Sequence, residues 1–125
     1  MASKSESVID YLRDADTVTI ATKRMTGHEH ETPIWAVTVD GVPYVRSVNG
    51  QDARWYQDVM REGGAAIVTP DGRMPVTMTP MADHSKDAAI DAAYTAKYSR
   101  YPKDILAPEF GEPARQNTLM VRPAS

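Results

Sequence analysis

Residues 31–56 constrain the fold more than any other stretch of this sequence. Two apolar segments are separated by Asp40 and Gly41, and a two-residue hairpin turn needs positive φ angles, which these residue types adopt at low cost. Residues 34–39 carry largely apolar side chains on both faces at period two, as expected for a strand covered on each side. Pro43 cannot donate a ladder hydrogen bond, so it belongs at the start or edge of the return strand. The stretch predicts a β-hairpin followed by a helix.

The return strand ends in polar residues that folding does not require. Arg46 and Ser47 close the strand, and Asn49 follows with a glycine. A guanidinium fork, a hydroxyl and a flexible backbone at one strand end suit an anion such as phosphate. Asp52 can cap the next helix, whose N-terminal N–H groups are also suited to an anion. The alternative interpretation is that Arg46 is a solvated strand residue and Trp55 belongs to the core.

Length and composition limit the class of protein. A chain of 125 residues predicts one domain, residues 1–125, with a modest core. The net charge of −3 gives no reason to expect nucleic-acid binding. The absence of cysteine excludes disulfides and thiolate chemistry. The chain has no apolar run near the roughly 20 residues of a membrane span and no secretory signal at its start. We therefore expect a cytoplasmic protein with neither nucleic-acid nor membrane partners.

The remaining elements follow from periodicity and from Gly and Pro. Helices are predicted near residues 5–14, 52–62 and from Asp83 or Ser85 to about residue 99. Further strands are predicted at 17–24, 65–69, 74–81 and 117–122, with 74–81 at a sheet edge because prolines bracket it, and residues 102–116 are predicted to be a loop. The resulting fold class is α+β: a small, six-stranded, mostly antiparallel barrel with flanking helices.

Two groups of residues could carry chemistry outside the hairpin. Tyr94, Tyr98 and Tyr101 follow one another at i, i+4 and i+7; such a stripe is more often core than site, although a buried phenol needs a hydrogen-bond partner. His28 and His30 share one strand face at a spacing that metal sites use. The third histidine is distant in the sequence, so a solvated hairpin tip is favoured over a metal site.

The segments TKRMTGHEHETPIW, DGVPYVRSVNG and ARWY resemble the FMN-binding, pyridoxamine-phosphate-oxidase-like superfamily of split β-barrels. They are most similar to its small deazaflavin-dependent nitroreductase-like proteins. The shared order is a strand with a basic end, Thr-Pro, a hairpin, a small-residue turn and a helix that opens with Trp. The resemblance covers nearly the whole chain, and its motifs are moderately specific because none is a catalytic signature.

The resemblance implies a homodimer that binds FMN or an 8-hydroxy-5-deazaflavin coenzyme near its interface. Basic residues and backbone amides would hold the phosphate, and the ring would lie near Trp35. The positions that the resemblance assigns to the cofactor are Lys23, Arg24, Thr32, Pro33, Ile34, Trp35, Arg46, Ser47, Asn49 and Trp55.

One departure from the family pattern bears on the cofactor. The loop expected to be basic reads GHEHE, with Glu29 and Glu31 in place of cations. At ~6 Å and an effective dielectric of ~20, each carboxylate beside a phosphate costs on the order of 2–3 kcal/mol. Either the phosphate lies nearer Arg46, or the chain has lost the cofactor and kept the pocket.

Three functions remain open. The first is a flavin- or deazaflavin-dependent oxidoreductase for a small apolar or aromatic substrate, with Tyr98 or Tyr94 as the proton donor. The second is a cofactor-independent isomerase, lyase or cyclase with a His base and an Arg or Tyr partner. The third is a binding module for a small hydrophobic molecule, which leaves the polar strand end unexplained. The expected substrate contacts are Trp35, Tyr44, Tyr56, Tyr94, Tyr98, His28 and His30.

Overall fold

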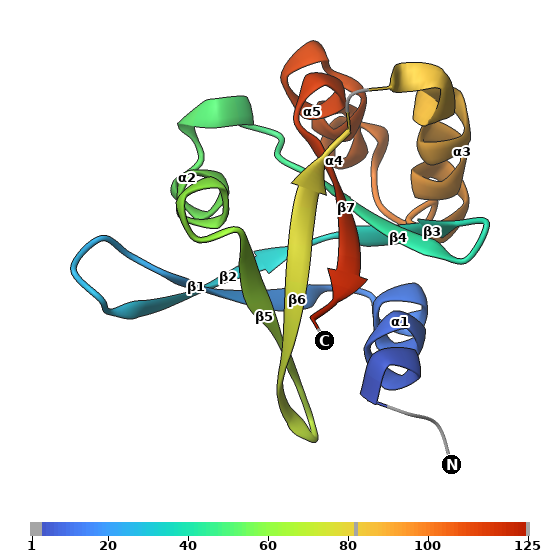
Figure 1. The fold of residues 1–125 in the computed structure, drawn as a ribbon. Coiled ribbons are helices and arrows are strands. Elements are labelled where there is room, and N and C mark those ends of the chain that lie inside the picture. The colour runs from blue at the N-terminus through green and yellow to red at the C-terminus, as the bar shows by residue number, and fades with distance from the viewer. Residues whose placement is uncertain (1–3, 82, 125) are drawn as a thin grey trace.

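The computed structural model describes residues 4–81 and 83–124. Seven strands form one antiparallel sheet in the order β2-β1-β5-β6-β7-β4-β3 (Figure 1). The strands are β1 (Val18–Lys23), β2 (Glu29–Ile34), β3 (Ala36–Val39), β4 (Val42–Arg46), β5 (Gly64–Thr69), β6 (Gly72–Pro80) and β7 (Thr118–Pro123). The helices are α1 (Lys4–Asp14), α2 (Arg54–Glu62), α3 (Asp87–Lys97), α4 (Lys103–Leu106) and α5 (Glu112–Gln116), with 3₁₀ turns η1 (Gly50–Asp52), η2 (His84–Lys86) and η3 (Ala107–Phe110).

The sheet curls because its two edge strands are consecutive in the chain. β2 pairs with β1 at one edge and β3 pairs with β4 at the other, yet only Trp35 separates β2 from β3. The two edges must therefore meet at Trp35, which produces a half-barrel with one split. The α+β split barrel is confirmed, but the predicted count of six strands is wrong. The sequence pattern runs on through Trp35 at period two and hides the break.

The central hairpin forms as predicted. Asp40 and Gly41 have φ angles of 52° and 81°, and the register pairs Val39 with Val42. Both turn residues therefore occupy the left-handed region that such a turn requires. Pro43 is the second residue of β4, in agreement with its expected place near the strand start.

Two predictions about proline-containing segments are wrong. β6 lies between β5 and β7 rather than at an edge. Pro75 is tolerated there because its carbonyl oxygen accepts from Ala124 N, and Ala124 lies beyond the last residue of β7. The missing N–H of Pro75 would face the same place, so no hydrogen bond of the ladder is lost. Residues 102–116 form α4, η3 and α5 instead of a loop. Their prolines lie at the N-terminal ends of these turns, where a missing N–H costs nothing.

The start of α2 also differs from expectation. Asp52 belongs to η1, and the residue that precedes α2 is Ala53, which makes no side-chain capping bond. The end of α2 is as predicted, because Gly63 has a φ of 81° and its N–H donates to Val59 O.

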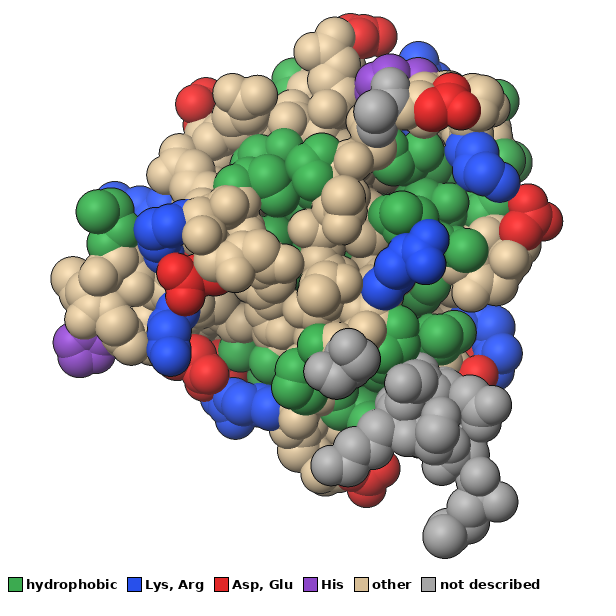
Figure 2. Space-filling model, viewed as in Figure 1, with side chains coloured by type: hydrophobic (Ala, Val, Ile, Leu, Met, Phe, Trp, Pro, Cys, Tyr) green, Lys and Arg blue, Asp and Glu red, His purple; other side chains and the backbone are tan. Residues whose placement is uncertain are grey.

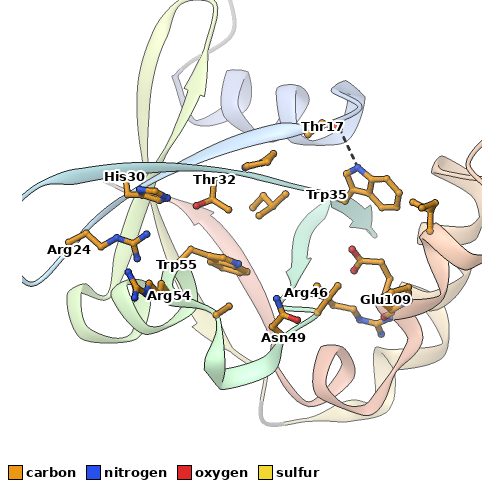
Figure 3. A pocket seen from close by; sticks show the side chains of 16 residues that line it. Thr17, Arg24, His30, Thr32, Trp35, Arg46, Asn49, Arg54, Trp55 and Glu109 are labelled. Carbon is orange, nitrogen blue, oxygen red and sulfur yellow. Dashed lines mark hydrogen bonds between the residues drawn. The ribbon is translucent and has the colours of Figure 1, made fainter.

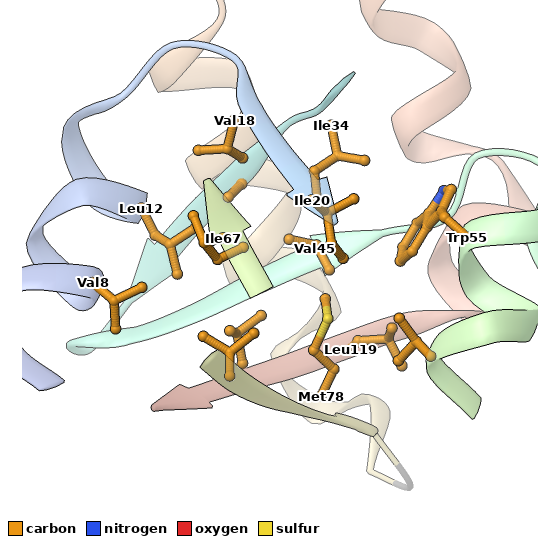
Figure 4. Close-up of a cluster of buried hydrophobic side chains, with 14 of the residues drawn as sticks. Val8, Leu12, Val18, Ile20, Ile34, Val45, Trp55, Ile67, Met78 and Leu119 are labelled. Atoms are coloured by element: carbon orange, nitrogen blue, oxygen red, sulfur yellow. The ribbon is translucent and has the colours of Figure 1, made fainter. Parts of the chain in front are cut away.

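Two apolar clusters hold the molecule together. The first fills the barrel, where Val8 and Leu12 of α1 meet Ile20, Ile67 and side chains from five further strands and α2 (Figure 4). The second packs α3 against the outer side of β3 and β4. Among the described residues, no helix has the length and apolar character to cross a bilayer.

Candidate functional site

A pocket of about 600 Å³ opens at the split of the barrel (Figure 3). β2 and Trp35 form one wall, and the end of β4, the start of α2 and the η3 turn form the others. The residues that line it are Thr17, Arg24, His30, Thr32, Pro33, Ile34, Trp35, Arg46, Val48, Asn49, Ala53, Arg54, Trp55, Ile105, Pro108 and Glu109.

One end of the pocket is cationic. Arg24, His30 and Arg54 gather there from β1–β2 and α2 (Figure 3). Arg24 pairs with Asp58 at 3.0 Å, and Asp58 also pairs with Arg61. No hydrogen bond or ion pair among the described residues involves the Arg54 side chain. Its guanidinium thus remains available for an anion at the mouth of this end.

The acidic hairpin residues turn away from the pocket. Glu29 and Glu31 alternate along β2 with His30 and Thr32, so they project from the opposite face. Both carboxylates pair with Arg73, Glu31 at 2.8 Å. In Figure 2, acidic and basic side chains lie next to one another on the side where Figure 1 shows the β1–β2 hairpin. Their orientation and their pairing with Arg73 therefore lower the Coulomb penalty expected for a phosphate in the pocket.

Arg46 lines the pocket, but its hydrogen bonds are made inside the protein. Its side chain is 0% exposed and pairs with Asp91 at 2.6 Å. It also donates to Glu109 O at 2.9 Å, to Thr118 Oγ1 at 3.2 Å and to Asp87 O at 3.4 Å. The interpretation of Arg46 as a solvated residue is wrong, and its fork is engaged by α3, η3 and β7 rather than presented to a ligand.

The other predicted cofactor positions fall into two groups: those that line the pocket and those that lie outside it. Ser47 is buried outside the pocket, where its hydroxyl donates to Gly50 O at 2.7 Å, and the exposed Lys23 side chain also lies outside it. The pocket brings together the remaining eight of the ten: Arg24, Thr32, Pro33, Ile34, Trp35, Arg46, Asn49 and Trp55.

Trp35 is held rigidly at the pocket wall. Its ring stacks on Tyr98 with centroids 4.2 Å apart and an interplanar angle of 7°, and Tyr101 lies 4.8 Å away. The indole Nε1 donates to Thr17 Oγ1 at 3.3 Å. An aromatic surface fixed in this way loses little conformational freedom when a flat ligand binds to it.

Tyr94 and Tyr98 do not reach the pocket, so their expected role as proton donors is not supported by their positions. The Tyr98 hydroxyl accepts from Ala36 N at 3.2 Å and donates to Asp16 O at 2.7 Å. The Tyr94 hydroxyl donates to Trp35 O at 3.2 Å. Burial raises the pKa of both phenols well above the ordinary value. These two tyrosines instead fasten α3 to the junction between the edge strands.

The remaining predicted substrate contacts are also dispersed. Tyr44 is buried against α3, and Tyr56 is buried in the barrel core, where burial raises its pKa. His28 is exposed and lies outside the pocket lining, whereas His30 is part of it. Of that set, the pocket receives Trp35 and His30. Among the described residues, no group of three His, Asp or Glu side chains is placed to hold a metal ion.

Seven residues of the pocket lining were not predicted from the sequence, and two of them, Arg54 and Glu109, carry ionisable groups. Arg54 had one available signal, because it opens the helix that carries Trp55 and so lies at a helix N-terminus. Glu109 had no such signal, because the prolines and the glycine of residues 102–116 predict a loop. Glu109 is only 8% exposed, and burial raises the pKa of its carboxyl to about 7. Its Oε2 atom is buried and has no hydrogen-bond partner among the described residues.

Several solved structures share this fold. An F420 reductase is 16% identical with a TM-score of 0.58, and the match covers 100% of this chain and 97% of the reductase. A Listeria innocua protein assigned to the pyridoxamine 5′-phosphate oxidases is 9% identical with a TM-score of 0.60, covering 98% and 93%. HutZ, the heme storage protein of Vibrio cholerae, is 10% identical with a TM-score of 0.58, covering 99% and 92%.

These similarities show that the chain has the split-barrel fold that the F420 reductase and the pyridoxamine 5′-phosphate oxidase-like protein share. A search of curated proteins found no match. Residues 8–121 match a family described as "uncharacterized protein conserved in bacteria" (DUF2255), and the chain belongs to that family.

Proposed function

We propose that this protein is an oxidoreductase that uses FMN or a deazaflavin coenzyme to transform a small apolar or aromatic substrate. The proposal rests on one observation: the pocket is cationic at one end and aromatic along the rest of its length. Its cationic end contains Arg54, whose side chain has no partner within the described part of the chain, and Trp55 and Trp35 lie along the rest of its length (Figure 3). A coenzyme with a phosphate at one end and a fused ring at the other has the matching polarity.

The proposal assigns each end a task. Arg24, Arg54 and His30 bind the phosphate through charge-assisted hydrogen bonds. Trp55 and Trp35 hold the ring and the substrate by stacking. The coenzyme, when bound, supplies hydride chemistry, and the protein supplies placement. The fold shared with an F420 reductase supports this reading, while the shared fold of a heme storage protein makes heme a useful competitor in binding tests.

We also propose a homodimer whose interface covers the pocket rim. Val48 and Ile105 line the pocket yet are 38% and 53% exposed. A second copy over these side chains would enclose the ligand and remove apolar surface from water. Light scattering after size exclusion should give twice the 13.8 kDa chain mass, and Ile105→Asp should shift the species toward monomer. A wild-type monomer at high micromolar concentration would contradict the dimer.

One observation favours a second function. Glu109 and His30 place two titratable side chains in the same pocket, and such groups can catalyse isomerisation or elimination without a cofactor. Under this alternative the pocket binds neither coenzyme, and its activity follows a bell-shaped pH profile.

Binding titrations test the proposal directly. FMN, a deazaflavin coenzyme and heme are each titrated into the purified protein, with calorimetry and absorbance as readouts. We expect FMN or the deazaflavin to bind, and Arg54→Ala to weaken that binding. Arg122→Ala, which removes an exposed cation outside the pocket lining, serves as the matched control and should bind normally. No binding of either coenzyme at high micromolar concentration would exclude the redox function.

A further inference from the structure

Glu109 is a buried carboxyl that faces the pocket at the end opposite the cationic cluster. It belongs to the η3 turn, and Figure 3 shows its carboxyl group pointing into the pocket between Trp35 and Arg46. The side chain is 8% exposed, and Oε2 has no hydrogen-bond partner in the described part of the chain. A buried polar atom without a partner is uncommon in a folded protein, so its orientation toward a ligand cavity calls for an explanation.

The neighbouring charges do not hold Glu109 in its ionised form. Arg46 is the nearest cation, but its guanidinium pairs with Asp91 and contacts only the backbone carbonyl of Glu109. Asp91 in turn also pairs with Arg115.

Tyr94 of α3 and Tyr98, which follows α3, add no positive charge near Glu109, because burial raises the pKa of both phenols and keeps them neutral. Loss of solvent contact therefore outweighs the attraction of Arg46, and it raises the pKa of Glu109 to about 7. Protonated and ionised forms coexist at neutral pH, which is the condition that favours proton transfer.

We propose that Glu109 is the proton donor of this pocket and that its protonated carboxyl binds the polar atom of a substrate held against Trp35. The inference rests on the proposed redox function. It assigns to Glu109 the role of proton donor, which the sequence interpretation gave to Tyr98 or Tyr94. The substrate class is an apolar or aromatic molecule with one polarised double bond, such as a carbonyl or imine.

In the proposed reduction, each electron pair and each proton has a donor and an acceptor. The coenzyme, when bound in its reduced form, would supply hydride to the carbon of the polarised double bond, so the substrate would gain two electrons and the coenzyme would lose them. The π bond breaks, and its electron pair takes the proton of Glu109 at the oxygen or nitrogen. The carboxylate that remains recovers a proton from water after the product leaves. Separation of Glu109 from the cationic end keeps this transient carboxylate away from the coenzyme phosphate.

The carboxyl titration is measured first, on the protein without coenzyme. Carbon-13 NMR of labelled glutamate side chains should show one carboxyl with a midpoint near 7. Glu109→Gln should remove that signal, whereas Glu112→Gln, an exposed neighbour in α5, should retain it. A Glu109 midpoint below about 5, the ordinary range for Glu, would overturn the inference even if coenzyme binding is normal.

Kinetics with the bound coenzyme then test the transfer itself. In Glu109→Gln we expect kcat to fall roughly 10²- to 10⁴-fold, with coenzyme affinity unchanged and only a small change in KM. The wild-type kcat should fall tenfold per pH unit above the measured midpoint, and the residual rate of the variant should be flat. Glu112→Gln should behave as the wild type.

The possible failures are distinguishable. If the coenzyme binds and Glu109→Gln keeps the wild-type kcat and pH profile, the inference about Glu109 is wrong while the redox function stands. If neither coenzyme binds to the wild type, the redox function fails, and proton donation in a reduction fails with it. Circular dichroism of each variant distinguishes a loss of activity from a loss of folded structure.

Discussion

Arg46 and Arg54 both line the pocket, but their guanidinium groups have opposite surroundings. Arg46 is buried and bonded to Asp91, to Thr118 and to two backbone carbonyls. Arg54 lies on the exposed first turn of α2, and no bond of its side chain occurs within the described residues. An arginine of the first kind organises the fold, whereas one of the second kind can bind a ligand. Residue type and position along the chain do not separate the two; the internal partners do.

The largest expected effect is on the stability contributed by Arg46. Arg46→Met should lower the free energy of unfolding by about 3–5 kcal/mol, because removal of one partner leaves other buried groups uncompensated. Arg54→Ala should change it by less than about 0.5 kcal/mol. Urea denaturation measures both. Equal losses in the two variants would remove the distinction between the two arginines.

The pH dependence of stability should come next in size. The pKa of Glu109 is raised from 4.5 to about 7 in the folded protein, so the folded state binds the proton more tightly than the unfolded state. This contribution is fully present below pH 4.5 and is lost as the pH rises through about 7. The loss is on the order of 3 kcal/mol.

Urea denaturation at pH 5 and pH 8 measures this loss, and Glu109→Gln provides the reference that lacks the titrating group. We expect the variant to be less sensitive to pH than the wild type over that interval. Parallel stability curves for the two proteins would show that Glu109 does not titrate near neutrality.

Arg54→Ala should have a smaller effect, confined to ligand affinity. Loss of a charge-assisted hydrogen bond should weaken phosphate-bearing coenzymes by about 1.5–3 kcal/mol, and inorganic phosphate should compete with them at the same site. Calorimetry gives the affinity, with Arg122→Ala as the control. Normal affinity in Arg54→Ala would move the anion site to Arg24 and His30.

The smallest effect is expected at Arg73 of β6, which pairs with two carboxylates of β2. Its partners Glu29 and Glu31 are exposed, and exposed pairs contribute only about 0.2–1 kcal/mol. Arg73→Ala should lower stability by no more than this and leave coenzyme affinity unchanged. A clear loss of affinity at low salt would show that the hairpin charges do act on the pocket.

Local signals in the sequence were sufficient for much of the fold. Asp40-Gly41 determined a hairpin, Gly63 ended α2, and alternation located β1, β5 and β7 close to their true bounds. Features that depend on distant partners were not accessible. The break at Trp35 is caused by pairing to opposite sheet edges, and the same alternation would describe one unbroken strand.

The site, like the fold, was predictable only where neighbouring residues carry the information. The Thr32–Trp35 segment and Trp55 line the pocket, and they were expected at the site from the family resemblance, whose motifs are contiguous in the sequence. The role of Arg46 was not, since its partner Asp91 lies 45 residues away. Glu109 is functional in our proposal only because folding removes it from water, and its neighbours in the chain carry no sign of that burial.

The junction at Trp35 links ligand choice to architecture. Trp35 is the bridge between the outermost strands, it lines the pocket, and its ring stacks on Tyr98, the residue that follows α3. A smaller side chain there would enlarge the cavity and, in the same event, loosen the closure of the barrel. A change of side-chain shape at the exposed rim positions Val48 and Ile105 would alter the pocket mouth without disturbing this junction.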